Sequence, residues 1–208
     1  MNDISKTQRR SQAYWFVDGL AEMIGGVALA AVGALLYFSI SADNQTFGTA
    51  ALFVMILAFP LSAKAVRWAK DRLTHQRTGY VSYPQPSGRR RATSAIVAGV
   101  LGVVFAVSAV TFGDPTFGGT LGTYMLVGLG VAVSASLVVR AGQMGMPRFY
   151  LSAAAVAGAA IWALARGLGF IAGMGVVWMA LGAASLITGL IALGRYLRAT
   201  SSLPGETE

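Results

Sequence analysis

Two acidic residues, Asp18 and Glu22, stand four positions apart at the start of the first long apolar run. At this spacing the two carboxylates share one face of a helix. A carboxylate at this depth in a membrane is costly unless a cation pairs with it or it faces a polar cavity. The pair is therefore a candidate intramembrane acid site, serving either transport of a cation or proton, or helix packing.

The packing alternative requires a counter-charge at the same membrane level. Four basic residues satisfy this requirement: Arg67, Lys70, Arg140 and Arg148. A buried pair with one of them would make a structural clamp, and the acids would also gain from the positive end of the helix dipole. A polar cavity leading to Glu22 would instead favour transport.

A basic segment with interleaved tyrosines, residues 67–91, is the second candidate site. Its first part, residues 67–73, is predicted to continue the second helix. Near a membrane surface each Lys or Arg adds roughly 1 kcal/mol of attraction to anionic headgroups. The segment therefore suits anionic lipid or an acidic partner protein, with an ordinary cytoplasmic loop as the alternative. The candidate contact residues are Arg67, Lys70, Arg72, Arg77, Tyr80, Arg89, Arg90 and Arg91.

The sequence offers little for catalysis or metal binding. His75 is the one histidine and the chain contains no cysteine, so no ligand set for zinc and no thiol nucleophile can be assembled. Nucleophile-elbow, metalloprotease and phosphate-loop motifs are missing. We therefore predict no catalytic residue, no metal and no cofactor, and we favour a protein that is not an enzyme.

Composition indicates a membrane protein. Of the 208 residues 55% are hydrophobic and only 12% are charged, about half the charged fraction of a typical soluble domain. The formal net charge of +8 might suggest nucleic acid as a partner, but the basic residues lie between apolar runs rather than on a polar domain. Anionic lipid explains the charge better, and no nucleic acid is expected.

The apolar runs predict an all-α membrane protein with six transmembrane helices, since about 20 helical residues cross a bilayer. Short links pair these helices as three helical hairpins. The predicted spans are residues 19–40, 47–63, 92–112, 120–139, 149–165 and 168–194. We expect residues 1–17 to form an N-terminal segment, 18–198 the membrane domain with the basic loop 67–91, and 199–208 a flexible tail.

Charge asymmetry gives the orientation. Fifteen of the sixteen Lys and Arg residues fall on one side of these spans, and only Arg166 falls on the other. Short loops rich in Lys and Arg stay in the cytoplasm, so both termini are predicted to be cytoplasmic.

Small residues recur at intervals of four, as in Gly26/Ala30/Ala34 and Ser185/Gly189. In lipid, such spacing lets helix backbones approach closely. This favours a compact bundle, with a homo-oligomer through the sixth span as the alternative.

The run 72–81, RLTHQRTGYV, resembles the signature R-(I/L)-T-x-P-R-T-G-Y-V of a group of uncharacterised bacterial six-span membrane proteins. Gln76 stands where that signature has proline. Residues 14–19 and 146–150 are also similar to that group. The resemblance implies a multi-pass protein of the bacterial inner membrane, without assigning any catalytic residue. The predicted function is docking of anionic lipid or a protein partner at the cytoplasmic face, and the alternative is a small transporter or channel using Glu22 and Asp18.

Overall fold

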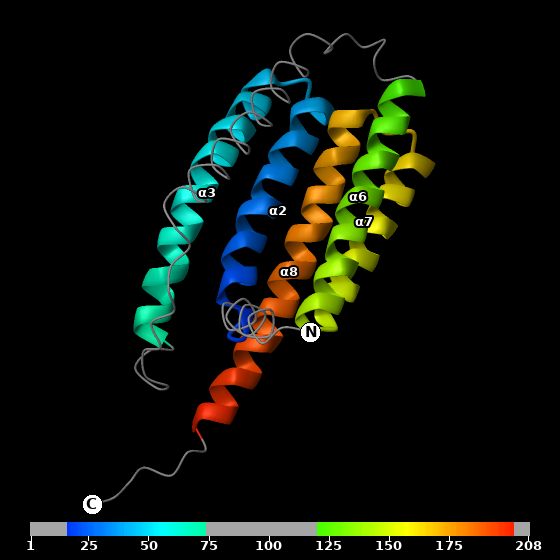
Figure 1. The fold of residues 1–208 in the computed structure, drawn as a ribbon. Coiled ribbons are helices and arrows are strands. Elements are labelled where there is room, and N and C mark those ends of the chain that lie inside the picture. The colour runs from blue at the N-terminus through cyan, green and yellow to red at the C-terminus, as the bar shows by residue number, and fades with distance from the viewer. Residues whose placement is uncertain (1–15, 74–119, 202–208) are drawn as a thin grey trace, which may run out of the picture.

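The computed structural model describes residues 16–73 and 120–201, which form five helices (Figure 1). These helices are α2 (Leu20–Ser41), α3 (Gln45–Leu73), α6 (Thr120–Met144), α7 (Arg148–Ala165) and α8 (Phe170–Ser201). No strand occurs in these two described ranges, which confirms the all-α prediction for them. Five of the six predicted spans coincide with these helices, and the run 92–112 lies outside the described residues.

Four of the helices, α2, α6, α7 and α8, are long and apolar enough to cross a membrane. Helix α3 adds a fifth candidate if its two halves, Thr46–Ala58 and Pro60–Arg72, are one span bent by 48°. Large apolar side chains such as Ile56, Leu151 and Ile161 point outward from these helices and are exposed. Acyl chains suit such a surface, so the fold is that of a membrane protein.

The bend in α3 has a covalent cause. Pro60 has no backbone N–H to donate to the carbonyl four residues earlier, and its ring crowds that carbonyl. Beyond the bend the helix runs on to Leu73, well past the apolar run. The prediction that residues 67–73 continue the second helix is therefore confirmed.

The first and last described helices, α2 and α8, make the most extensive contact among the five described helices. Three glycines of α2 and its cap, seven residues apart, face three glycines of α8 with the same spacing; the opposed pairs are Gly19/Gly189, Gly26/Gly182 and Gly33/Gly175. A Cβ built on Gly26 would lie 2.7 Å from the Gly182 carbonyl oxygen, and one built on Gly182 would lie 2.6 Å from the Gly26 oxygen. Backbone therefore rests on backbone along this antiparallel pair, called the glycine seam below.

The glycine seam adds a longer spacing to the predicted interval of four. Gly26 and Ala30, four residues apart, both contact the backbone of Gly182, while the opposed glycine pairs recur every seven residues. A period of seven keeps one seam facing its partner in a left-handed supercoil. Because α2 covers it, the glycine face of α8 serves packing inside the chain.

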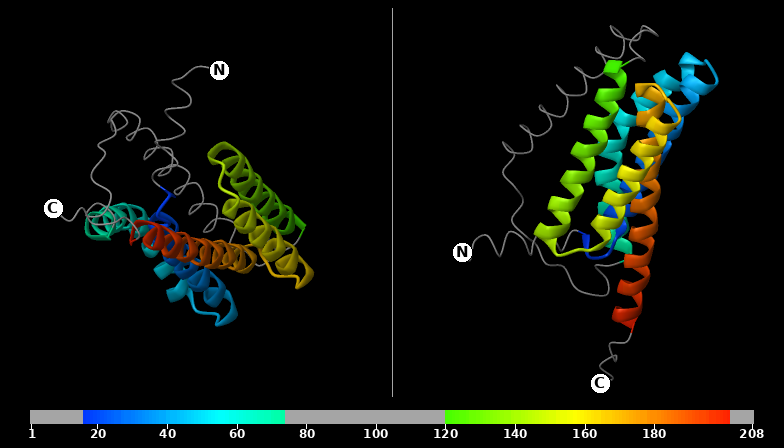
Figure 2. Two further views of the ribbon diagram at one scale, coloured as in Figure 1. Left: turned by 90° about the horizontal axis from the view of Figure 1, so that it is seen from below. Right: turned by 90° about the vertical axis from the view of Figure 1, so that its right-hand side faces the viewer.

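The helices are arranged with α8 at the centre, as Figure 2 shows in the view from below. Helices α2 and α3 lie on one side of it, and α6 and α7 lie on the other, where Leu126, Val156 and Val177 form a fully buried core. Helices α2 and α7 begin, and α3, α6 and α8 finish, at one end of this bundle (Figure 1). We call this end the basic end, because eight of the nine Lys and Arg residues in the described ranges lie there.

Candidate functional site

The start of α2 is a tight turn that places both acidic residues against the bundle. Gly19 has a φ of 72°, a left-handed conformation that favours glycine, and a Cβ here would also clash with Gly189 of α8. The Asp18 carboxylate accepts a hydrogen bond of 3.2 Å from the N–H of Leu20. Asp18 therefore caps an otherwise unsatisfied donor at the positive end of the helix.

Lys70 of α3 pairs with Asp18. Its Nζ lies 3.0 Å from Asp18 Oδ2, and both side chains are almost fully buried, with 5% and 6% of their surfaces exposed. Lys70 shares the inner face of α3 with Val66 and Ala69, which are also buried. This pair ties the last turns of α3 to the start of α2.

Arg148, at the first turn of α7, pairs with Glu22. Its Nη2 lies 2.8 Å from Glu22 Oε1, although the geometry is that of an ion pair without an aligned hydrogen bond. The other carboxylate oxygen accepts a hydrogen bond of 3.4 Å from the Thr188 hydroxyl of α8, which also lies 2.8 Å from the Ala184 carbonyl. Glu22 therefore links α2 to both α7 and α8.

The same guanidinium fastens α7 to the residues that precede α2. Arg148 Nη2 donates a hydrogen bond to the carbonyl oxygen of Phe16, and the ring of Phe16 meets the ring of Phe149 edge-on, with centroids 5.9 Å apart. Nη2 also lies 3.3 Å from the sulfur of Met146. Arg148 is therefore held in place by several partners before any ligand is considered.

Asp18, Glu22, Lys70 and Arg148 form a charge-balanced group, called the ion cluster below. Its two carboxylates and two cations come from the starts of α2 and α7 and the last turns of α3, so that three helices meet in it. Attraction between buried charges repays their lost hydration only where each has a close partner, and removal of one partner leaves a costly lone charge. The arrangement suits a packing clamp.

The other predicted site residues are distributed differently. Arg67 and Arg72 are exposed on the outer face of α3, and Arg140 is exposed near the end of α6, so neither Arg67 nor Arg140 is the counter-charge. Arg67 Nε donates to the carbonyl of Ala63 in its own helix. The predicted contact residues Arg77, Tyr80, Arg89, Arg90 and Arg91 lie outside the described residues.

Thr188 is a member of the site that was not predicted from the sequence. Its signal was a hydroxyl-bearing residue within the sixth apolar run, at the inner third of that run. Within the described ranges, no three His, Cys, Asp or Glu side chains come together in a way that could hold a metal ion.

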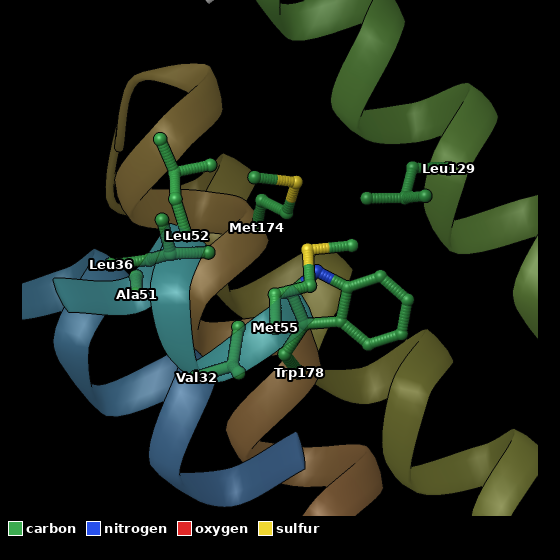
Figure 3. Close-up of a pocket in the computed structure, with 8 residues that line it drawn as sticks. All are labelled: Val32, Leu36, Ala51, Leu52, Met55, Leu129, Met174 and Trp178. Atoms are coloured by element: carbon green, nitrogen blue, oxygen red, sulfur yellow. The ribbon is translucent and has the colours of Figure 1, made fainter. Parts of the chain in front are cut away.

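An apolar cleft of about 120 Å³ lies elsewhere, among α2, α3, α6 and α8 (Figure 3). Its lining residues are Val32, Leu36, Ala51, Leu52, Met55, Leu129, Met174 and Trp178. Val32 is ten residues beyond Glu22 on α2, which at 1.5 Å per residue separates the cleft from the ion cluster by about 15 Å along the helix. Glu22 therefore faces cations and a hydroxyl rather than this cleft.

Comparisons with known proteins add no relative to this description. No family model matches the chain, and neither a curated protein nor a solved structure matches it.

Proposed function

We propose that this protein is a non-enzymatic integral membrane protein whose basic end binds anionic lipid headgroups. The observation that carries the proposal is the concentration of exposed cations at that end. Six of its eight basic residues are exposed, namely Lys64, Arg67, Arg72, Arg140, Arg195 and Arg198. The one exposed acidic residue among them is Asp71, so the accessible charge at this end is strongly positive.

The ion cluster has a separate role in this proposal, that of a clamp. The two remaining cations of the basic end, Lys70 and Arg148, are paired with the buried acids. The basic residues at this end therefore comprise two structural cations and six exposed ones. The pairing of Glu22 with Arg148, about 15 Å from the apolar cleft, supports the clamp over the transport alternative.

The proposed topology has six spans in three hairpins with both termini in the cytoplasm of a bacterial cell. Helix α3 finishes at the basic end and α6 begins at the opposite end, so an odd number of crossings is needed between them. The run 92–112 is the one apolar stretch between these helices that is long enough to cross. Membership of the six-span bacterial group that the run 72–81 resembles is part of the same proposal.

Lipid selectivity tests the function. The full chain, purified in detergent, is mixed with equal amounts of phosphatidylglycerol and phosphatidylcholine, and native mass spectrometry measures which lipid stays bound. We expect at least a tenfold preference for phosphatidylglycerol, because each near-surface cation contributes roughly 1 kcal/mol. The preference should fall when ionic strength is raised from about 0.15 M to about 1 M. Equal retention of both lipids at low salt would reject the proposed function.

A further inference from the structure

We infer that the lower half of α3, Pro60–Arg72, carries a discrete binding site for the headgroup of an anionic phospholipid. The site consists of Lys64, Arg67, Trp68 and Arg72, called the α3 stripe below. The inference rests on the proposed function and adds to it a location, a ligand class and a role for Trp68.

The α3 stripe occupies one side of its helix. At about 100° per residue, its four members fall within an arc of roughly 140°. Every one of them is exposed. The buried residues Val66, Ala69 and Lys70 fall on the opposite side and face α2. The half-helix is therefore amphipathic, with a packed side and a side that combines three cations with an indole ring.

The two arginines of the stripe are partly preorganised for a phosphate. The guanidinium carbon of Arg72 lies 4.8 Å from the ring centroid of Trp68, a stacking distance. Stacking covers the face of a guanidinium and leaves its N–H donors, which lie in the plane, directed outward. Arg67 is anchored through Nε by the Ala63 carbonyl, which leaves its two terminal nitrogens for a ligand. Such forks match two oxygens of one phosphate.

Trp68 indicates that the ligand belongs to a membrane rather than to solution. Its side chain is 59% exposed although it is the largest in this part of the helix. Indole rings favour the headgroup level, where an apolar ring and a polar N–H are both satisfied. The stripe extends about 12 Å along the helix from Lys64 to Arg72, and long basic side chains reach toward the headgroups from either side of that level.

The backbone beneath the stripe is firmly held. Lys70 fixes this half of α3 to Asp18 from the opposite side, and Pro60 gives it an inclination that differs by 48° from that of the upper half. A site on a fixed helix loses less entropy on binding than one on a loop. Asp71 lies on the exposed side among the cations and reduces the formal charge of the stripe from +3 to +2.

Two triple variants with the same change of charge test the location. The first is Lys64→Gln/Arg67→Gln/Arg72→Gln on α3. The second, its control, is Arg140→Gln/Arg195→Gln/Arg198→Gln, which removes three exposed cations from α6 and α8 at the same end. Phosphatidylglycerol is titrated into each full-length variant, and its dissociation constant is measured by native mass spectrometry. We expect both triples to bind more weakly, because each removes near-surface cations, and we expect the α3 triple to lose at least tenfold more affinity than the control triple.

The outcomes separate the two proposals. Equal weakening by both triples would overturn the α3 stripe and leave the proposed function standing, whereas a wild-type chain without lipid preference would remove both. No weakening by the α3 triple would also overturn the site. If the α3 triple fails to fold, Arg67→Lys/Arg72→Lys keeps the charge and loses the forks, and binding at wild-type strength would then contradict the inference.

Two further measurements test whether binding depends on the positive charge of the stripe and whether the ligand is a membrane lipid or a soluble phosphate. Asp71→Asn should strengthen phosphatidylglycerol binding by about fivefold, because it removes the one negative charge on the exposed side. Soluble glycerol phosphate at millimolar concentration should not displace the lipid. Displacement by it would assign the stripe to a soluble phosphate and overturn the membrane assignment.

Discussion

Each buried carboxylate near the start of α2 is held by a cation from a different helix, Asp18 by Lys70 and Glu22 by Arg148. In each pair the cation lies within 3.0 Å of the carboxylate. Keeping a buried pair and breaking it therefore have very different effects on the free energy of unfolding. A close pair offsets most of its own desolvation, whereas a lone buried charge costs roughly 3–5 kcal/mol.

This asymmetry leads to a prediction for the Asp18–Lys70 pair. Lys70→Met should lower the free energy of unfolding by roughly 3–5 kcal/mol, and the double variant Asp18→Asn/Lys70→Met should recover much of that loss. Thermal unfolding in detergent, followed by circular dichroism, measures both. Lys64→Met is the matched control, since Lys64 is exposed on the same helix and should change stability little. A double variant that is less stable than Lys70→Met would contradict the clamp.

The sequence predicted the acids and a set of four cations, but it could not select the partners. Hydropathy predicts the depth of a residue in the membrane, and it places all four cations at the same depth: Arg67, Lys70, Arg140 and Arg148. The selection depends on which face of α3 packs against α2. Lys70 follows Val66 and Ala69 on the buried face, whereas Arg67 points outward. That face is fixed by tertiary packing rather than by local composition.

At the scale of helices, the glycine seam determines how closely α2 and α8 approach. In a membrane, helix association depends on packing rather than on exclusion of water, so close backbone contact is a main source of its strength. A single methyl group at Gly26 would meet the backbone of Gly182 and Leu186, which cannot rotate away. Gly25, its neighbour, has nothing within 4 Å of a Cβ.

Adjacent glycines therefore provide a test of the seam. Gly26→Ala should destabilise the protein by about 1–3 kcal/mol through overpacking. Gly25→Ala should be neutral or stabilising by up to about 1 kcal/mol, because alanine favours the helix more than glycine does. The midpoint of thermal unfolding in detergent compares the two. Similar losses of stability in both variants would show that the seam is not the close contact described here.

Hydropathy predicted the helices well, because a long apolar run needs intramolecular hydrogen bonds wherever it meets lipid. The ends were less predictable. Helix α3 continues for ten residues past the run 47–63. In this extension Lys70 lies on the buried face of the helix. The seven-residue glycine spacing was visible in the sequence, but pairing the first helix with the last is a long-range feature that no local pattern specifies.

At the scale of the molecule, the basic end and its opposite should lie on different sides of the membrane. The chain contains no cysteine, so single introduced cysteines can be labelled without background. Asn44→Cys, in the turn between α2 and α3, should react with a membrane-impermeant maleimide in intact cells. Gln143→Cys, at the end of α6, should react only after the membrane is opened.

Arg166→Cys in the turn between α7 and α8 is the control, since it should behave like Asn44→Cys. If Gln143→Cys were labelled in intact cells and Asn44→Cys were not, the proposed orientation would be reversed. Labelling of both positions in intact cells would contradict the arrangement of the described helices across a single membrane.

The contact between the first and last described helices also means that the bundle cannot be completed until the end of the chain has been synthesised. Thr188, which completes the surroundings of Glu22, lies 166 residues further along the chain. At about 5–20 residues per second, a ribosome that has added Glu22 needs roughly 8–33 s to reach Thr188. For the first 126 residues of that interval α2 has neither its glycine partner nor Arg148, because both lie further along the chain. The contacts that complete the surroundings of Glu22 can therefore form only after the last helix has been made.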